Sequence, residues 1–84
     1  MIAAILTIPI SEKTDDDKYF SRFVKEADGL MHAYQLESGD EIIVLSMWIS
    51  EAKRDAFMAT QLRSDVDKSY PSGTRKVYRV TNVG

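Results

Sequence analysis

Four stretches of the chain have the length and composition of β-strands. Two of them are apolar at nearly every position, which indicates strands that are buried on both faces. Pro9 indicates that the first strand ends near Ile8, because proline lacks the backbone donor that a sheet requires. The predicted strands cover residues 2–10, 30–37, 42–49 and 76–83.

An amphipathic helix is predicted between the first two strands. Thr14, with Asp17 three residues later, resembles a capping box at its start, and Gly29 ends it. At spacings of one, three and four residues, its apolar side consists of Tyr19, Phe20, Phe23, Val24 and Ala27.

A second helix is predicted to begin at Glu51, with the hydroxyl of Ser50 as its N-cap, and to extend to Leu62 or as far as Lys68. Its small side chains predict a close approach to the sheet. The stripe expected to face the sheet is Ala52, Ala56, Ala59 and Leu62, with the stem of Arg63 as an alternative and Phe57 on the flank.

A tight turn at Ser38, Gly39 and Asp40 joins the second and third strands into a hairpin. Gly39 is expected to hold a backbone conformation that other residues adopt with difficulty. A two-residue loop and a three-residue loop would place opposite faces of the second strand beside Trp48, so the pattern leaves the register open.

The order β-α-β-β-α-β over 84 residues predicts one α+β domain, residues 1–84, of the ferredoxin-like type. We expect a four-stranded antiparallel sheet with two helices on one face. Those helices leave one face uncovered, although the first and third strands are apolar on both. We therefore expect a homodimer in which two sheets pack face to face.

Composition argues against several classes of function. The net charge of −2 argues against binding of nucleic acid or of an anionic membrane surface, and the absence of cysteine excludes disulfides and thiolate metal ligands. RNA-recognition motifs share this order of elements, but their basic and aromatic strand residues are missing. No apolar run approaches the ~20 residues of a membrane span, and no basic residue precedes Lys13, so we expect a cytoplasmic protein.

Residues 29–59, and above all the run MWISEAKRDAFMA, resemble the antibiotic biosynthesis monooxygenase family. Trp48-Ile49-Ser50 matches the Trp-x-Ser signature that precedes the second helix of that family. The resemblance implies a dimeric α+β barrel. It also implies a cofactor-independent monooxygenase acting on a small planar aromatic or quinone-type substrate. The alternative is a non-catalytic small-molecule-binding or dimerisation module of the same fold.

The sequence departs from the functional residues of that family. The haem-degrading branch pairs the tryptophan with an asparagine on the first strand and a histidine on the second helix, and the polyketide branch adds asparagine, tyrosine and arginine. Only Trp48 can be matched. Haem degradation is therefore not expected, and we predict that the protein uses no cofactor and no metal.

Candidate site residues each have a structural alternative. Trp48 is a candidate wall of a pocket, with its N–H orienting a ligand, or a core tryptophan. His32, the only histidine, is a candidate base or haem ligand, or else a packed or half-exposed residue. The ligand-binding candidates are Trp48, Tyr19, Phe23, Tyr34 and Phe57.

The remaining polar candidates have simple explanations. Tyr70 and Tyr78 could hydrogen-bond a phenol, although tyrosine also serves sheet faces and interfaces. The acidic run 15–17 could bind a metal, but acidic residues also stabilise a helix N-terminus. The basic pairs 53–54 and 75–76 are interpreted as solvated charge.

Overall fold

The computed structural model describes residues 1–13 and 18–84, and the side chain of every described residue but the one at position 18. The predicted capping box of Thr14 and Asp17, and the acidic run 15–17, lie outside the described residues. In chain order the elements are β1 (Ile2–Pro9), the short 3₁₀ helix η1 (Ile10–Glu12), α1 (Lys18–Glu26), β2 (Leu30–Glu37), β3 (Glu41–Trp48), α2 (Glu51–Met58), α3 (Gln61–Ser69) and β4 (Thr74–Arg79).

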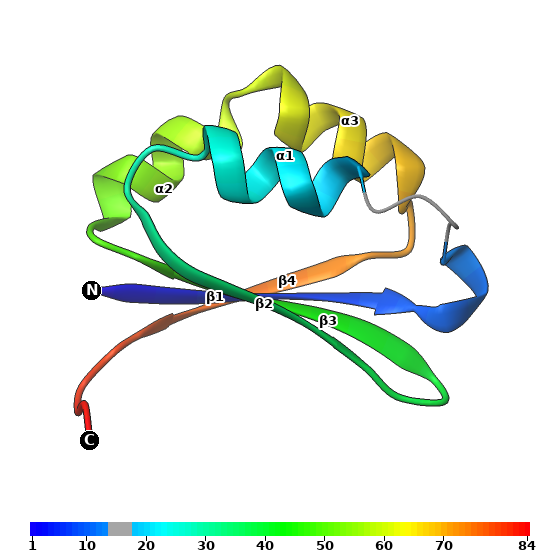
Figure 1. Cartoon of the computed structure of the whole chain (residues 1–84), viewed down its shortest axis with the longest axis horizontal. Coiled ribbons are helices and arrows are strands. Elements are labelled where there is room, and N and C mark those ends of the chain that lie inside the picture. Colours follow the sequence, from blue (N-terminus) through cyan, green and yellow to red (C-terminus); the bar gives the residue numbers. More distant parts are fainter. Residues whose placement is uncertain (14–17) are drawn as a thin grey trace.

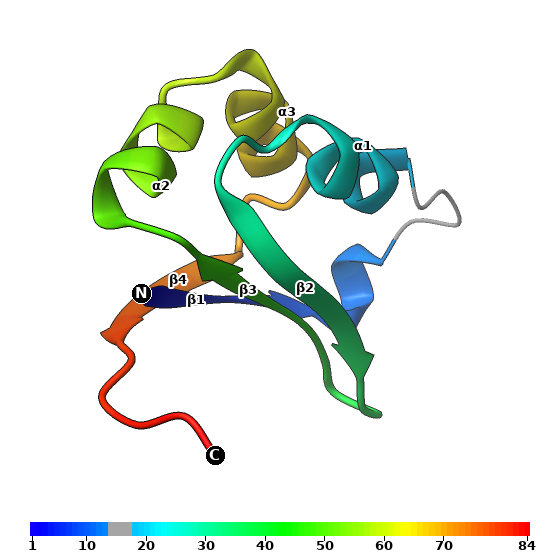
Figure 2. The ribbon, with the colours of Figure 1, turned by 60° about the vertical axis from the view of Figure 1, so that its left-hand side comes forward.

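The strands form one antiparallel sheet in the order β2-β3-β1-β4, and all the long helices lie on one of its faces (Figures 1 and 2). This confirms the predicted α+β architecture. None of the described helices is both long and apolar enough to span a membrane.

The predicted second helix is in fact two helices, α2 and α3, which meet at Ala59 and Thr60. The Thr60 hydroxyl donates to Phe57 O at 2.6 Å and accepts from Arg63 N at 3.3 Å. It thereby caps the start of a new helix, because threonine side chains compete with backbone groups for hydrogen bonds. The prediction of a single helix was wrong for this reason.

The alanine stripe expected to face the sheet was also wrong. Ala52, Ala56 and Ala59 are exposed, whereas the partly buried side of α2 carries Arg54, Phe57 and Met58. These three residues are spaced by three and four positions and so share one side of the helix. The helix is therefore turned so that larger side chains approach the sheet.

The hairpin between β2 and β3 closes at Ser38, whose backbone N–H donates to Glu41 O at 2.9 Å, so that the loop consists of Gly39 and Asp40. Ser38 Oγ accepts from the backbone N–H groups of Asp40 and Glu41. Gly39 does not have the unusual conformation that we expected. Among the described residues, only Gly29 has a positive φ, at 85°. A Cβ atom at Gly29 would also lie 2.5 Å from Lys53 Cβ, so α2 packs directly on this turn.

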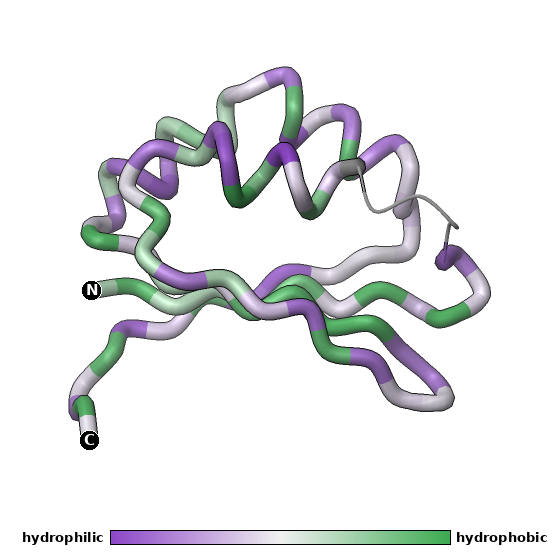
Figure 3. The backbone as a smooth tube through the Cα atoms, in the orientation of Figure 1, coloured by the Kyte–Doolittle hydropathy of each residue, from purple (hydrophilic) through white to green (hydrophobic). Residues whose placement is uncertain are grey.

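Register divides the strand residues between the two faces of the sheet. Ile2 lies opposite Trp48 and Ile8 opposite Ile42, so the even-numbered residues of β1 and β3 face the helices. Most of β1 and β3 is hydrophobic along its length, whereas hydrophobic and hydrophilic residues alternate along α1 (Figure 3). The buried cluster on the helix side consists of Phe23, Trp48 and Leu62.

The opposite side of the sheet is uncovered in the single chain, and we call it the open face. A register shift between Leu30 and His32 places the even-numbered residues His32, Tyr34 and Leu36 opposite odd-numbered residues of β3, and therefore on the open face. By register the open face consists of Ala3, Ile5, Thr7, His32, Tyr34, Leu36, Ile43, Leu45, Met47, Thr74, Lys76 and Tyr78. Tyr34, Leu36 and Tyr78 are 54%, 50% and 43% exposed.

Candidate ligand pocket

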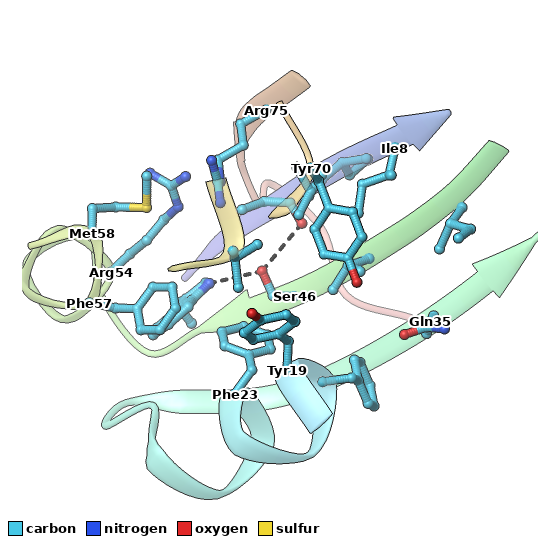
Figure 4. A pocket seen from close by; sticks show the side chains of 18 of the residues that line it. Ile8, Tyr19, Phe23, Gln35, Ser46, Arg54, Phe57, Met58, Tyr70 and Arg75 are labelled. Atoms are coloured by element: carbon cyan, nitrogen blue, oxygen red, sulfur yellow. Dashed lines mark hydrogen bonds between the residues drawn. The ribbon is translucent and has the colours of Figure 1, made fainter. Parts of the chain in front are cut away.

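A pocket lies between the helix-facing side of the sheet and the helices (Figure 4). Its cavity volume is about 100 Å³, and it opens to solvent. Most of its surface is apolar, contributed by β1, β3 and the inner sides of α1 and α2. The polar side chains among its lining residues are Lys13, Tyr19, Gln35, Ser46, Arg54, Tyr70 and Arg75.

Three aromatic rings from three different elements form one wall of this pocket. Phe23 of α1 lies 5.8 Å from Trp48 of β3 and 5.1 Å from Phe57 of α2, measured between ring centroids. Trp48 and Phe57 are 5.4 Å apart. The rings are tilted towards one another, as aromatic pairs prefer. A planar ligand would therefore meet an aromatic wall that is already assembled.

The indole N–H of Trp48 is used within the protein. Trp48 Nε1 donates to Ser46 Oγ at 3.0 Å, and that hydroxyl donates to the Ala4 carbonyl at 3.3 Å (Figure 4). The two side chains meet because residues two apart in a strand share a face. Trp48 is only 1% exposed. The interpretation that its N–H orients a ligand was wrong: the indole is a core side chain whose ring contributes to the pocket.

Four of the five predicted ligand-binding residues line the pocket: Trp48, Tyr19, Phe23 and Phe57. Tyr34 does not, because the register shift in β2 puts it on the open face. His32 lies on that face as well and is exposed. Neither residue is placed to contact a ligand in this pocket, and the lining residue that β2 supplies is Gln35.

One side of the pocket carries two tyrosines. The Tyr19 and Tyr70 rings meet edge to face with centroids 6.2 Å apart, and Ser69 Oγ donates to Tyr19 Oη at 3.0 Å. Tyr70 follows directly on α3 and brings its ring back over the sheet. Both residues belong to the lining of the pocket, beside the wall formed by Phe23, Trp48 and Phe57.

A cluster of arginines occupies another side. Arg75 Nη1 donates to Asp67 Oδ1, and Arg63 Nε lies 2.8 Å from Asp67 Oδ2 without the alignment of a hydrogen bond. Burial lowers the pKa of Arg54, and the positive charges of Arg75 and Arg63 lower it further, against the opposite effect of Asp55. The prediction that Arg54 and Arg75 are solvated charge was wrong, since both are partly buried and line the pocket.

The sequence interpretation missed Arg54, Met58, Gln35 and Ser46 as lining residues. The spacing of Arg54, Phe57 and Met58 could have revealed the inner side of α2, but the alanine stripe gave an equally regular pattern. Ser46 could have been noticed as the one polar residue in an apolar strand. The orientation of β2 gave no such signal.

The described lining includes no histidine and no carboxylate. In the part of the chain that the structure describes, no three His, Cys, Asp or Glu residues are grouped so that they could hold a metal ion. The functional groups available to a ligand are therefore cationic, amide and hydroxyl groups.

Comparison with known proteins identifies the fold. No protein-family model and no curated protein sequence matches the chain. Solved structures do match: Rv0793 from Mycobacterium tuberculosis has a TM-score of 0.79 at 12% identity, covering 98% of this chain and 96% of that one. The chain thus has the α+β fold of the antibiotic biosynthesis monooxygenases, several of which are among its structural neighbours.

Two of these neighbours are enzymes by name. SnoaB, a cofactor-independent oxygenase from Streptomyces nogalater, has a TM-score of 0.74 at 8% identity and covers 98% of this chain and 94% of its own. The monooxygenase from the gene ActVA-Orf6 of Streptomyces coelicolor, in complex with nanaomycin D, has a TM-score of 0.71 at 16% identity, with coverages of 98% and 88%. At these identities the likeness establishes the fold alone.

Proposed function

We propose that this protein binds a small planar aromatic or quinone-type molecule in the pocket and oxidises it with molecular oxygen, without a cofactor. The observation that carries the proposal is the wall of three aromatic rings beside a cavity of about 100 Å³. Support comes from neighbours with this fold that are named as a cofactor-independent oxygenase and as a monooxygenase with a bound ligand.

The chemistry needs little from the protein when the substrate is electron-rich. A phenol can reduce oxygen directly: one oxygen atom becomes a new ring carbonyl in place of a C–H bond, the other leaves as water, and the product is a quinone. The ring supplies all the electrons. The protein then has to bind the ring, exclude water and favour the phenolate form, tasks suited to an apolar pocket with cationic groups.

The volume of the cavity limits the size of the substrate. About 100 Å³ is comparable with the ~150 Å³ apolar cavity that accommodates benzene in an engineered protein. One aromatic ring fits within the pocket, and a second ring would extend through its opening. We therefore propose a substrate whose reacting part is a single ring.

The second candidate function is a non-catalytic small-molecule-binding module. The observation that favours it is the lack of a histidine or carboxylate among the described lining residues, since these are the usual general bases. His32 cannot serve as the base in this pocket, because it lies on the open face.

We also propose that the protein is a homodimer that packs through the open face. Supporting this, large apolar side chains such as Tyr34 and Leu36 are half exposed on the face that no helix covers. A patch of this kind is unusual for a monomer. The cytoplasmic location expected from the sequence stays a prediction.

Oxygen uptake tests the oxygenase function. Purified protein, treated with a chelator, would be given a panel of hydroxylated one-ring and two-ring aromatics in an oxygen electrode. We expect saturable oxygen uptake that is lost in Val44→Phe, where a ring added on β3 fills the pocket. Val24→Phe is the matched control, the same change at an exposed α1 position outside the described lining.

Two results would count against this function. Uptake that survives Val44→Phe would place the reaction outside the pocket. Saturable binding without any uptake across the panel would favour the binding module instead.

A further inference from the structure

α2 turns an arginine, rather than an apolar residue, towards the pocket. Arg54 shares the inner side of the helix with Phe57 and Met58, while three alanines of the same segment are exposed. A helix selected only for packing would have the opposite arrangement, with alanines inward and arginine outward. Figure 4 shows Arg54 and Arg75 on the same side of the pocket, reached from α2 and β4.

The Arg54 guanidinium has no hydrogen-bond or ion-pair partner among the described residues. The carboxylate in this cluster, Asp67, already contacts both Arg63 and Arg75. Asp67 therefore pairs with two of the three guanidinium groups, whereas Asp55 acts on Arg54 without forming an ion pair with it. The cluster places an excess of positive charge beside a mainly apolar cavity.

A partly buried cation without a partner is unfavourable, because it loses hydration and receives nothing in return. The lowered pKa of Arg54 has this origin, with burial as its largest cause. A ligand with an anionic group would supply the missing partner. The planar fork of an arginine pairs best with a carboxylate, through two parallel hydrogen bonds.

We propose that the ligand of this pocket is a one-ring aromatic carboxylate, with its ring against Phe57 and Phe23 and its carboxylate on Arg54. The inference rests on the proposed function in one respect, the pocket as the ligand site. It adds the charge of the ligand and the residue that selects it. Arg54 takes the role of specificity residue, which the aromatic wall cannot fill because it does not distinguish charge.

Matched ligands test this directly. 4-Hydroxybenzoate and 4-hydroxybenzamide have the same shape and differ in charge. Binding is followed in ¹⁵N-labelled protein by the indole N–H signal of Trp48, the only tryptophan. We expect the carboxylate to bind at least ~10-fold more tightly than the amide, the ratio of a charge-assisted hydrogen bond to a neutral one.

Variants assign the preference to one residue. In Arg54→Gln and Arg54→Met the ratio of the two dissociation constants should fall to about 1, since the charged partner is gone. Arg54→Lys, which keeps the charge and loses the fork, should give an intermediate ratio. Arg22→Gln is the control: it removes one positive charge from the exposed side of α1, and the full ratio should persist.

Thermal melting adds a readout that does not depend on the ligand. Arg54→Met should melt at the same or a higher temperature than the wild type, because an unpaired and partly buried charge is removed. A lower melting temperature together with an unchanged ratio would mean that Arg54 acts through its stem in packing, which overturns the proposal.

The outcomes separate this inference from the function it rests on. Equal binding of acid and amide by the wild type overturns the inference alone. A preference that persists in Arg54→Gln overturns it as well. Absence of binding by both ligands overturns the ligand pocket itself, and selective binding without oxygen uptake leaves the inference standing while the oxygenase function fails.

Discussion

The two faces of the sheet are built from equally apolar strands, yet only one of them is covered. On the helix side, β1 and β3 present Ala4, Ile8, Ile42 and Trp48, all less than 9% exposed. On the open face, the same two strands present Ile5, Leu45 and other large apolar residues, with no helix over them. The pocket lies on the covered face, and among the open-face residues only Ile5 of β1 contributes to its described lining.

The difference shows that hydrophobicity of a strand does not reveal the role of each of its faces. Apolar residues next to the helices build both a core and the wall of a cavity. Apolar residues on the open face build a flat surface suited to a second copy. Both roles require the same residue types, so only the register tells them apart.

Loss of the Trp48 side chain on the covered face should have the largest effect on the free energy of unfolding. Trp48→Ala removes a ring that packs on Phe23 and Phe57, and should lower the free energy of unfolding by about 3–5 kcal/mol. Leu36→Ala on the open face should change the free energy of unfolding of the single chain by about 0.5 kcal/mol or less. Urea denaturation at the lowest usable concentration compares them, and equal losses would contradict the distinction between the faces.

Gly29 and Gly39, which lie in two of the chain's turns, should differ in the same way. Gly29→Ala is expected to lower the free energy of unfolding by about 1–3 kcal/mol, because its φ is positive and a Cβ would collide with Lys53. Gly39→Ala, in the hairpin, should change it by about 0.5 kcal/mol or less, since a Cβ there meets nothing within 4 Å. Thermal or urea unfolding of both variants checks this. If Gly39→Ala destabilised the protein more than Gly29→Ala, the close packing of α2 on the Gly29 turn would not be important for stability.

The smallest effect should be an electrostatic one at the edge of the covered face. Lys53 Nζ lies 2.5 Å from Asp28 Oδ2, and this hydrogen bond lowers the pKa of Asp28 below its ordinary value of 3.8. A carboxyl with a lowered pKa stabilises the fold above its ordinary value and ceases to do so as the pH falls through the lowered one. Both groups are exposed, so the contribution to stability is small.

NMR titration of the Asp28 carboxyl carbon measures this pair. We expect a midpoint below 3.8 in the wild type and a return towards that value in Lys53→Met. A midpoint that does not respond to Lys53→Met would mean that the ion pair does not fasten α2 to the turn before β2.

The sequence predicts the features of the fold that depend on a local residue pattern, and it fails for features that depend on contacts in the folded chain. The runs of β1 and β3 predict strands correctly because they are apolar at nearly every position and, at eight residues each, are short for a helix. The break at Thr60 was not predictable, since the same residue is tolerated inside a helix and its cap forms only when the chain turns. The rotation of α2 was ambiguous because alanines and larger residues each recur at helical spacing.

The site was predicted in its aromatic part and missed in its polar part. Phe23, Phe57 and Trp48 follow from apolar periodicity, which also defines the core. The positions of Tyr34 and His32 depend on a register shift in β2 that no residue pattern indicates. The role of Arg54 depends on the absence of a partner among the described residues, a property of the folded chain rather than of its sequence.

The most direct test of the account uses the methionines, which report on both faces in one spectrum. Met58 lines the pocket and Met47 lies on the open face, so protein labelled at the methionine methyl carbons gives a separate signal for each. We predict that 4-hydroxybenzoate shifts the Met58 signal and leaves Met47 unchanged, and that dilution shifts Met47 and leaves Met58 unchanged. A ligand that shifts Met47 alone, or dilution that shifts Met58 alone, would contradict the division of roles between the two faces.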